Sequence, residues 1–458
     1  MATATRNDPT SEHTDAHGRT DVLNITIVGA GLAGLAAAIS CSLAGHTVAV
    51  FEAAKELAEI GAGLQITPNA SKLFGEWGLE DSVRAVAAVP TVLAVHRYRD
   101  GKVLAEQRDF DKILQQRYGL PFFDIHRVDL QKILYDKAVS LGVKVHLDCR
   151  VLSVECTASG PKVTFRSGQE VHSDLVVGAD GLWSKCRESM LKTADQPLPT
   201  GDLAYRIVLH LDKIKDPELK EWIANPQVHF WIGPHSHAVA YSIRSGTMYN
   251  VVLLCPDDLP QGLSRATGSV DEMRALFSRW DPILLRFLEQ VEQVDKWKLM
   301  HRQELESWTN KDKNFVLLGD SCHPMLPYLA QGANSSIEDG GVLGRLLSYV
   351  KTREQLLWAI TLYERLRKPR SEKIARETFL QREAFHMPDG PEQRERDKVF
   401  ESQLGKEISG KFPSRWTCPE AQPWLYGYDA YREADEAVKS APYEPSLTSI
   451  TSSTPIDP

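Results

Sequence analysis

The sequence predicts a mixed α/β protein with a dinucleotide-binding sheet, a separate antiparallel sheet and a helical C-terminal part. Three observations support this prediction. Residues 23–52 alternate strand, glycine-rich turn, helix and strand. Residues 196–300 contain short strand-like runs separated by turns. Residues 353–386 are predicted to be helical, with Trp358, Ile360, Leu362 and Tyr363 on an amphipathic face, and Pro369 is expected to kink or divide this helix.

Composition limits the classes of protein that this chain can belong to. It has 458 residues, of which 42% are hydrophobic and 25% charged, as in ordinary globular proteins. The net charge of −8 argues against general nucleic-acid binding, which needs a basic surface. The seven cysteines contain no CxxC pair, so a reducing, cytoplasmic location fits better than a disulfide framework.

We predict a tail without regular structure at each end of the chain. Residues 1–21 are polar and lack the apolar stretch of a secretory signal, so we expect disorder there. Residues 441–458 are rich in Ser, Thr and Pro and are expected to be mobile. No run of 18 apolar residues occurs, so we predict no membrane span and no membrane partner.

The N-terminal segment carries the strongest motif. The strand LNITIV (23–28) runs into GAGLAG, a small-residue helix follows, and a second strand ends at Glu52. Gly29 permits the tight turn, Gly31 lets the backbone approach a pyrophosphate, and Gly34 lets the helix pack on the sheet. An acid at the position of Glu52 binds a ribose diol, which favours FAD or NAD over NADP.

Three further segments extend the pattern. They are EIGAGLQITPNA (59–70), LVVGADGLWSKCR (175–187) and NFVLLGDSCHPMLPYLAQGANSSIEDGGVLG (314–344). With GxGxxG, DG and GD segments in this order, the sequence resembles the group A flavoprotein aromatic monooxygenases, above all salicylate hydroxylases and fungal phenol hydroxylases. The resemblance covers roughly residues 22–385. The string HPMLPYLAQGAN carries it most specifically.

The resemblance implies a Rossmann-type FAD-binding domain like that of p-hydroxybenzoate hydroxylase. It implies that FAD lies along the chain, with Glu52 at the adenosine ribose and Val151 beside the adenine. It places Asp180 where FAD and the incoming nicotinamide meet. The remaining positions implied for the cofactor are Gly61, Gly63, Gln65, Arg127, Asp320, Pro324, Gly332, Ala333 and Asn334. The last three open a helix whose N-terminus suits the anionic edge of reduced flavin.

The same resemblance suggests how the domains are divided. A discontinuous FAD-binding domain covers residues 22–195 and 301–350, the substrate-binding sheet covers 196–300, and a helical segment covers 351–440. The sequence has no second GxGxxG, so NADH or NADPH is expected to visit transiently as a co-substrate. The segment 424–437 is interpreted as structural.

The candidate catalytic residues lie in the predicted antiparallel sheet. In HAVAYSI, His237, Val239 and Tyr241 fall on one face of a strand with period 2. Oxygen transfer from a flavin C4a-hydroperoxide, which the resemblance implies, needs an electron-rich ring in a dry pocket. A positive or hydrogen-bonding group must then hold the phenolate or carboxylate. We predict that Arg206 is this anchor, and that Tyr241 and His237 handle protons or orient the ring. Ser242 stands where the family often has Pro.

Pro324 and Met325 are expected over the flavin face, where a proline without N–H shapes a dry wall. Cys322 and His323 lack metal-ligand spacing, so no metal is predicted.

The leading hypothesis is a single-component FAD monooxygenase that uses NAD(P)H and O₂ to hydroxylate an electron-rich aromatic ring, salicylate-like or from secondary metabolism. Two alternatives stay open: an FAD-dependent epoxidase of an indole or alkene, and a flavin-binding protein without oxygenase activity. The sequence does not decide between possible substrates or between NADH and NADPH. It also does not decide whether the protein is a monomer or a homodimer.

Overall fold

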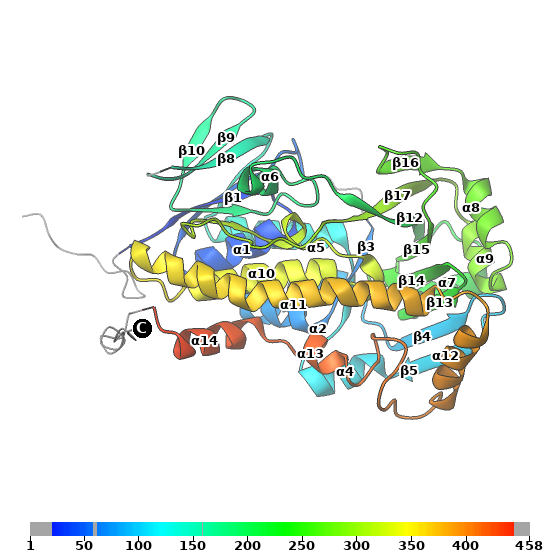
Figure 1. Cartoon of the computed structure of the whole chain (residues 1–458). Coiled ribbons are helices and arrows are strands. Elements are labelled where there is room, and N and C mark those ends of the chain that lie inside the picture. The colour runs from blue at the N-terminus through cyan, green and yellow to red at the C-terminus, as the bar shows by residue number, and fades with distance from the viewer. Residues whose placement is uncertain (1–20, 58–61, 158, 444–458) are drawn as a thin grey trace, which may run out of the picture.

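A five-stranded parallel sheet forms the nucleotide-binding part of the computed structural model, which describes residues 21–57, 62–157 and 159–443. Its strand order is β18-β11-β1-β2-β7 (Figure 1). The strands are β1 (Asn24–Val28), β2 (Thr47–Phe51), β7 (Lys144–His146), β11 (Leu175–Gly178) and β18 (Phe315–Leu317). The helix α1 (Leu32–Leu43) follows β1, so the predicted strand–helix–strand unit is confirmed.

Two glycines of the GxGxxG turn are required by close backbone contacts. Gly29 has φ +104°, and a Cβ added there would lie 2.4 Å from the carbonyl oxygen of Ala179. A Cβ on Gly34 would lie 1.9 Å from the oxygen of Gly29. At this turn β1, β11 and α1 approach so closely that a side chain at position 29 or 34 would clash with their backbones.

The helix α10 (Gln331–Leu347) packs against α1 at similarly short range. A Cβ on Gly340 would meet the backbone of Ala37 at 2.5 Å, and one on Gly344 would meet Ser40 at 2.2 Å. Small residues on both helices thus bring the start of α10 next to the glycine turn.

A second, eight-stranded sheet has the order β16-β17-β12-β15-β14-β13-β4-β5. Its strands are β4 (Val92–Arg97), β5 (Val103–Arg108), β12 (Leu198–His210), β13 (Gln227–Gly233), β14 (Ser236–Ile243), β15 (Met248–Pro256), β16 (Arg265–Gly268) and β17 (Val294–His301). The helices α7 (Pro217–Ala224), α8 (Val270–Phe277) and α9 (Pro282–Glu289) lie beside it (Figure 1). Residues of these helices and of one sheet face form a shared apolar core.

This sheet departs from the prediction in two respects. β4 and β5 come from residues 92–108, which the sequence analysis placed in the FAD-binding segment 22–195. The β13–β4 pair is parallel, so the sheet is mixed rather than purely antiparallel. Pairing between strands more than 100 residues apart has no local sequence signal.

Two small sheets complete the β structure. One has the order β10-β9-β8 and the other pairs β3 with β6. Their strands are β3 (Gly63–Ile66), β6 (Phe123–His126), β8 (Val151–Thr157), β9 (Gly160–Phe165) and β10 (Glu170–His172). The helices between these strands are α2 (Pro68–Glu76), α3 (Glu80–Val86), α4 (Phe110–Tyr118) and α5 (Arg127–Ser140), and α6 (Lys185–Leu191) follows β11.

The helix α11 (Leu356–Phe385) runs along both large sheets as a single 30-residue element (Figure 1). Pro369, which was expected to kink or divide the helix, lies inside it without dividing it. The remaining elements are the short 3₁₀ turns η1 (Gly319–Ser321), η2 (Pro327–Leu329) and η3 (Arg353–Gln355), and the helices α12 (Pro391–Ser402), α13 (Gln422–Tyr426) and α14 (Ala430–Ser440).

In the described parts of the chain, no helix is both long and apolar enough to cross a membrane.

Candidate active site

A cavity, called the central cavity below, lies between the glycine turn, the start of α10 and one face of the eight-stranded sheet. Residues from distant parts of the chain line it. Those from the nucleotide-binding side are Gly31, Leu32, Ala33, Gly63, Gln65, Arg127, Gly181, Asp320, Gly332 and Ala333. Those from the sheet and the loop before α10 are Ala204, Arg206, Phe230, His237, Val239, Tyr241, Val252, Leu254, Met325, Pro327 and Tyr328.

The glycine turn leaves room for a ligand at its tip. A Cβ added to Gly31 would meet no atom within 4 Å, in contrast to its neighbours Gly29 and Gly34. Gly31 caps α1, whose first N–H groups are directed toward this space. The carboxylate of Glu52 accepts hydrogen bonds from the backbone N–H groups of Ala30 and Ala54, both at 2.8 Å. These bonds fix the carboxylate of Glu52 beside the turn, where the sequence analysis predicted a residue that binds the ribose.

Asp320 and Arg127 lie on the cavity wall between the turn and α10. Arg127 is the first residue of α5, and its backbone N–H donates to the oxygen of Ala62 at 3.1 Å. Asp320 faces the cavity from η1, and its carboxylate makes no hydrogen bond to any residue that the structure describes. Burial raises the pKa of Asp320, whereas the nearby charges of His323 and Arg127 oppose that rise. The site thus offers an unpaired acceptor for hydroxyl groups.

The first turn of α10 is exposed to the central cavity through Gly332 and Ala333. Ala330, which precedes the helix, adopts φ +50°. Asn334 does not line the cavity. Its side chain accepts from the N–H of Thr67 at 2.9 Å and donates to the oxygen of Gln65 at 2.9 Å. Asn334 therefore ties α10 to β3 and α2 and positions the helix N-terminus.

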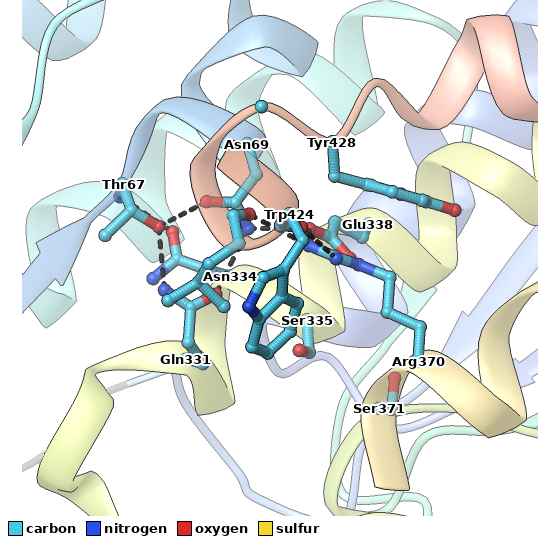
Figure 2. Close-up of polar contacts among 12 residues, drawn as sticks. Thr67, Asn69, Gln331, Asn334, Ser335, Glu338, Arg370, Ser371, Trp424 and Tyr428 are labelled. Carbon is cyan, nitrogen blue, oxygen red and sulfur yellow. Dashed lines mark hydrogen bonds and ion pairs between the residues drawn. The ribbon is translucent and has the colours of Figure 1, made fainter. Parts of the chain in front are cut away.

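Figure 2 shows that this tie is part of a larger buried network between α2, α10, α11 and the C-terminal segment. Asn69 donates to Gln331 at 3.1 Å and to Glu338 at 2.6 Å. Arg370 forms a bidentate pair with Glu338, both contacts at 2.8 Å, and stacks on Tyr428. Burial alone would raise the pKa of Glu338, but the charges of Arg370 and Arg367 outweigh it and the pKa is lowered.

Two other positions predicted for the cofactor, Asp180 and Val151, do not line the central cavity. Asp180 accepts from the Ser184 hydroxyl at 2.5 Å and from the N–H groups of Lys185 and Cys186 at 2.7 and 3.0 Å, which caps the start of α6. Val151 is buried at the start of β8. Gly61 lies outside the described residues.

Gln65 lines the cavity, and its amide donates to the carboxylate of Asp124 at 3.0 Å.

One face of the eight-stranded sheet forms the opposite wall. Its register aligns Arg206, Val252, Val239 and Phe230 in one cross-strand row. Ala204, Leu254 and His237 form the adjacent row. Tyr241 follows on the same strand as Val239 and His237, and all three line the cavity. The predicted shared face of these three residues is confirmed. The wall is apolar between its polar tips, as an aromatic ring requires.

Arg206 is the positive group of this wall. Its guanidinium lies 5.0 Å from the ring of Trp297 and forms no hydrogen bond or ion pair with the residues that the structure describes. Burial lowers its pKa, and the charge of Arg127 acts in the same direction. A half-buried guanidinium that faces a cavity and has no acidic partner among the described residues favours binding of an anion there.

Tyr241 and His237 are both almost fully buried. Burial raises the pKa of Tyr241, with a further contribution from Asp124, while the charge of Arg206 acts the other way. Burial lowers the pKa of His237 well below its ordinary value, and the neighbouring His386 adds to that shift. Tyr241 is thus a neutral hydroxyl and His237 a neutral imidazole near pH 7.

Of the two residues predicted over the flavin face, Met325 lines the cavity and Pro324 does not. Pro324 is buried just before Met325, and the proline that lines the cavity is Pro327 of η2. The sequence analysis also missed a tryptophan. Trp416 also lines the cavity, and its indole N–H donates to the oxygen of Tyr328 at 3.0 Å. Trp416 lies in an irregular segment before α13, where no periodicity marks a functional residue.

Cys322 and His323 have local partners. The Cys322 thiol donates to the oxygen of Gly319 at 3.4 Å, and His323 pairs with Asp339 at 2.5 Å. Within the described ranges, no group of three His, Cys, Asp or Glu residues could hold a metal ion.

The site has the features that a flavin dinucleotide needs. Gly31 leaves space for a pyrophosphate, Glu52 and Asp320 offer acceptors, and the α10 N-terminus suits an anionic edge. Fold and site thus define a dinucleotide-binding flavoprotein with a partly apolar pocket beside the cofactor.

Comparison with known proteins extends this assignment. The profile of the family described as "FAD binding domain" matches residues 19–378, and the chain belongs to that family. FAD-dependent monooxygenase OpS4 of Beauveria bassiana (strain ARSEF 2860) is 48% identical over 421 residues, covering 91% of this chain and 97% of OpS4. 3-amino-4-hydroxybenzoate 2-monooxygenase PtnB3 of Streptomyces platensis is 32% identical over 418 residues, covering 89% and 96%.

Among solved structures, a salicylate hydroxylase substrate complex superimposes with a TM-score of 0.75 at 20% identity, covering 93% of this chain and 99% of that one. The chain is an FAD-dependent monooxygenase, and the predicted cofactor and enzyme class are confirmed.

Proposed function

We propose that this enzyme hydroxylates a phenolic aromatic ring that carries a negative charge, with NADH or NADPH as the transient reductant. The observation that carries the proposal is the Arg206 guanidinium, which faces the central cavity and forms no ion pair with any acidic residue in the described part of the chain. An anionic ring would supply the partner. The relative PtnB3 is named for a substrate with both a phenol and a carboxylate, which supports this substrate class.

Bound FAD would pass electrons from NADH or NADPH to O₂, which supplies the oxygen atom. In our proposal, Glu52, Arg127, Asp320 and the first turn of α10 hold the cofactor. Arg206 binds the carboxylate or phenolate of the substrate, which fixes the ring in the cavity. Val239, Val252 and Phe230 form the apolar wall that excludes water from the ring.

Tyr241 would act on the phenolic oxygen. Its hydroxyl makes no hydrogen bond to another residue in the described part of the chain, and the residue lines the cavity. Because its pKa is raised, Tyr241 stays protonated and donates a hydrogen bond to a phenolate. Loss of a proton makes a phenol more electron-rich, which favours transfer of an electrophilic oxygen.

The test is NADH and NADPH oxidation by the purified, FAD-loaded enzyme with salicylate, hydroxybenzoates, resorcylic aldehydes and indoles, with mass analysis of products. We expect oxidation to be stimulated by a phenolic acid, whose product gains one oxygen or gains oxygen and loses CO₂. Turnover of an indole alone would overturn the proposal and favour epoxidation.

Tyr241→Phe separates these two reactions. Phenol hydroxylation should lose most of its turnover while the flavin content stays that of the wild type. An epoxidase, which needs no phenolate, should be little affected by the same substitution.

A further inference from the structure

We propose that His237 and His386 form a proton path that joins the central cavity to a second cavity and removes the phenolic proton of the substrate. This inference rests on the proposed function, because only a phenol has a proton to lose at that point. His386 follows the end of α11, in the predicted helical segment 351–440, where the sequence analysis named no catalytic residue.

The two imidazoles are in direct contact. Nδ1 of His237 and Nε2 of His386 share a hydrogen bond of 2.8 Å, although the residues are 149 positions apart. His237 lines the central cavity. His386 lines the second cavity together with Asp202, His235, Pro256 and Arg382. The pair therefore joins the central cavity to the second cavity.

The surroundings isolate the pair from other partners. The ring of Tyr328 lies 5.2 Å from that of His237, and Phe385 packs edge-on at 5.6 Å. The Tyr328 hydroxyl donates to Asp202, so it does not compete for either imidazole. The backbone N–H of His235 donates to the oxygen of His386 at 2.9 Å and fixes the main chain there. Nδ1 of His237 and Nε2 of His386 thus remain available for the bond between the two rings.

Burial keeps both rings neutral, despite the charged groups around His386. Asp202 and Arg382 form a bidentate ion pair beside His386, and His235, Tyr328, Glu383 and Glu392 complete the titratable surroundings. Burial lowers the pKa of His386 to about 4, with Asp202 acting in the opposite direction. The pKa of His237 is lowered as well. A neutral imidazole has one donor and one acceptor nitrogen, as a relay requires.

The transfer balances as three linked steps. The phenolic O–H bond breaks and its proton bonds to Nε2 of His237. The Nδ1–H bond of His237 breaks and its proton bonds to Nε2 of His386. The Nδ1 proton of His386 then passes to water in the second cavity. The substrate becomes a phenolate, a water becomes hydronium, and each ring changes tautomer. Reverse flow, when the product oxygen takes up a proton, restores both tautomers.

The experiment uses the FAD-loaded enzyme and 4-hydroxy-3-nitrobenzoate, a phenolic acid whose colour reports its ionisation. The enzyme is mixed with this probe in a stopped-flow instrument at a pH below the pKa of the free phenol. We expect His386→Phe to slow the appearance of the bound phenolate by about tenfold or more, because the path to water is cut. The final amplitude should be unchanged, since only the route is removed.

His235→Phe is the matched control, because His235 faces the same second cavity but its ring is outside the relay. It should ionise the probe at the wild-type rate. Imidazole added to His386→Ala should restore the rate, since the second cavity, of about 480 Å³, has room for it. A merely structural role of His386 would not respond to imidazole. His386→Gln is the alternative variant if the phenylalanine variant does not fold.

The outcomes separate the two proposals. If the wild type binds the probe without forming phenolate, both the relay and the proposed function are overturned. If the wild type forms phenolate and His386→Phe forms it equally fast, the relay is overturned and the proposed function stands. Slowing in His386→Phe, absence of slowing in His235→Phe and rescue by imidazole together support the relay.

Discussion

Gly63 of β3 lies directly against the ring of Tyr241. A Cβ added to Gly63 would lie 2.6 Å from Cε2 of Tyr241 and 2.8 Å from the side-chain carbon of Asn250. The N–H of Gly63 also donates to Asn250 at 2.8 Å, and Asn250 is the cross-strand neighbour of Tyr241. The strand that borders the cofactor space therefore fixes the position of a substrate-facing hydroxyl.

This contact predicts that Gly63→Ala disturbs the Tyr241 ring. The added methyl group overpacks a buried contact, so we expect a loss of about 1–3 kcal/mol in the free energy of unfolding and weaker substrate binding. Urea denaturation of the FAD-loaded enzyme measures the first effect. Gly75→Ala is the control, because a Cβ at Gly75 in α2 meets nothing within 4 Å and should stabilise the helix. Equal stability of both variants would contradict this account.

Gly31 gives a prediction about the cofactor alone. The methyl group added by Gly31→Ala would meet no protein atom within 4 Å, so the free energy of unfolding of the FAD-free protein should stay within about 0.5 kcal/mol of the wild-type value. The methyl group occupies the space through which the backbone approaches the pyrophosphate, so the Kd for FAD should rise by about tenfold or more. Flavin fluorescence titration measures it.

Gly34→Ala provides the contrast to Gly31→Ala. Its Cβ would lie 1.9 Å from the oxygen of Gly29, so this substitution should destabilise the fold itself. An unchanged Kd for FAD in Gly31→Ala would show that the pyrophosphate lies elsewhere.

Arg206 predicts how the enzyme selects its substrate. Arg206→Met keeps an unbranched side chain near Trp297 but removes the charge, so the Kd for hydroxybenzoates should rise by about ten- to a hundredfold, or roughly 1.5–3 kcal/mol. Arg206→Lys retains the charge but lacks the planar guanidinium group. Its Kd for hydroxybenzoates should therefore lie between those of the wild type and Arg206→Met. Spectral titration of the bound flavin reports both values. An equal loss for a neutral indole would argue that Arg206 shapes the cavity rather than binding an anion.

Local patterns in the sequence were sufficient for the glycine turn and for the strand face of His237, Val239 and Tyr241. Both depend on geometry that neighbouring residues set: a tight βα turn in one case and the two-residue period of a strand in the other. The face prediction therefore survived even though the sheet around it was only partly anticipated.

Contacts between distant residues could not be predicted in this way. Trp416 reaches the cavity, and His386 reaches His237, only because the C-terminal segments fold back on the large sheet. The choice between Pro324 and Pro327 depends on η2, a turn whose position the sequence did not reveal. Asp180 follows a strand, as predicted, but the helix α6 that begins just after it takes its carboxylate as a cap.

The buried histidines predict how stability depends on pH. The pKa of His386 falls from 6.5 to about 4 on burial, so the unfolded chain binds a proton that the folded chain does not between these values. The stability is fully present above pH 6.5 and is lost as the pH falls toward 4, by at most about 3 kcal/mol for this residue. His237, whose pKa is also lowered, adds a loss of the same sign.

His386→Gln should therefore flatten the fall in the free energy of unfolding between pH 6.5 and 4, as measured by urea denaturation at a series of pH values. The variant is less stable than the wild type near pH 7, because it loses the bond to His237, but the difference should shrink on acidification. His235→Gln controls for the loss of an imidazole at an exposed position. A slope in His386→Gln as steep as that of the wild type would mean that His386 is already protonated in the folded protein, and the neutral pair on which the relay depends would not exist.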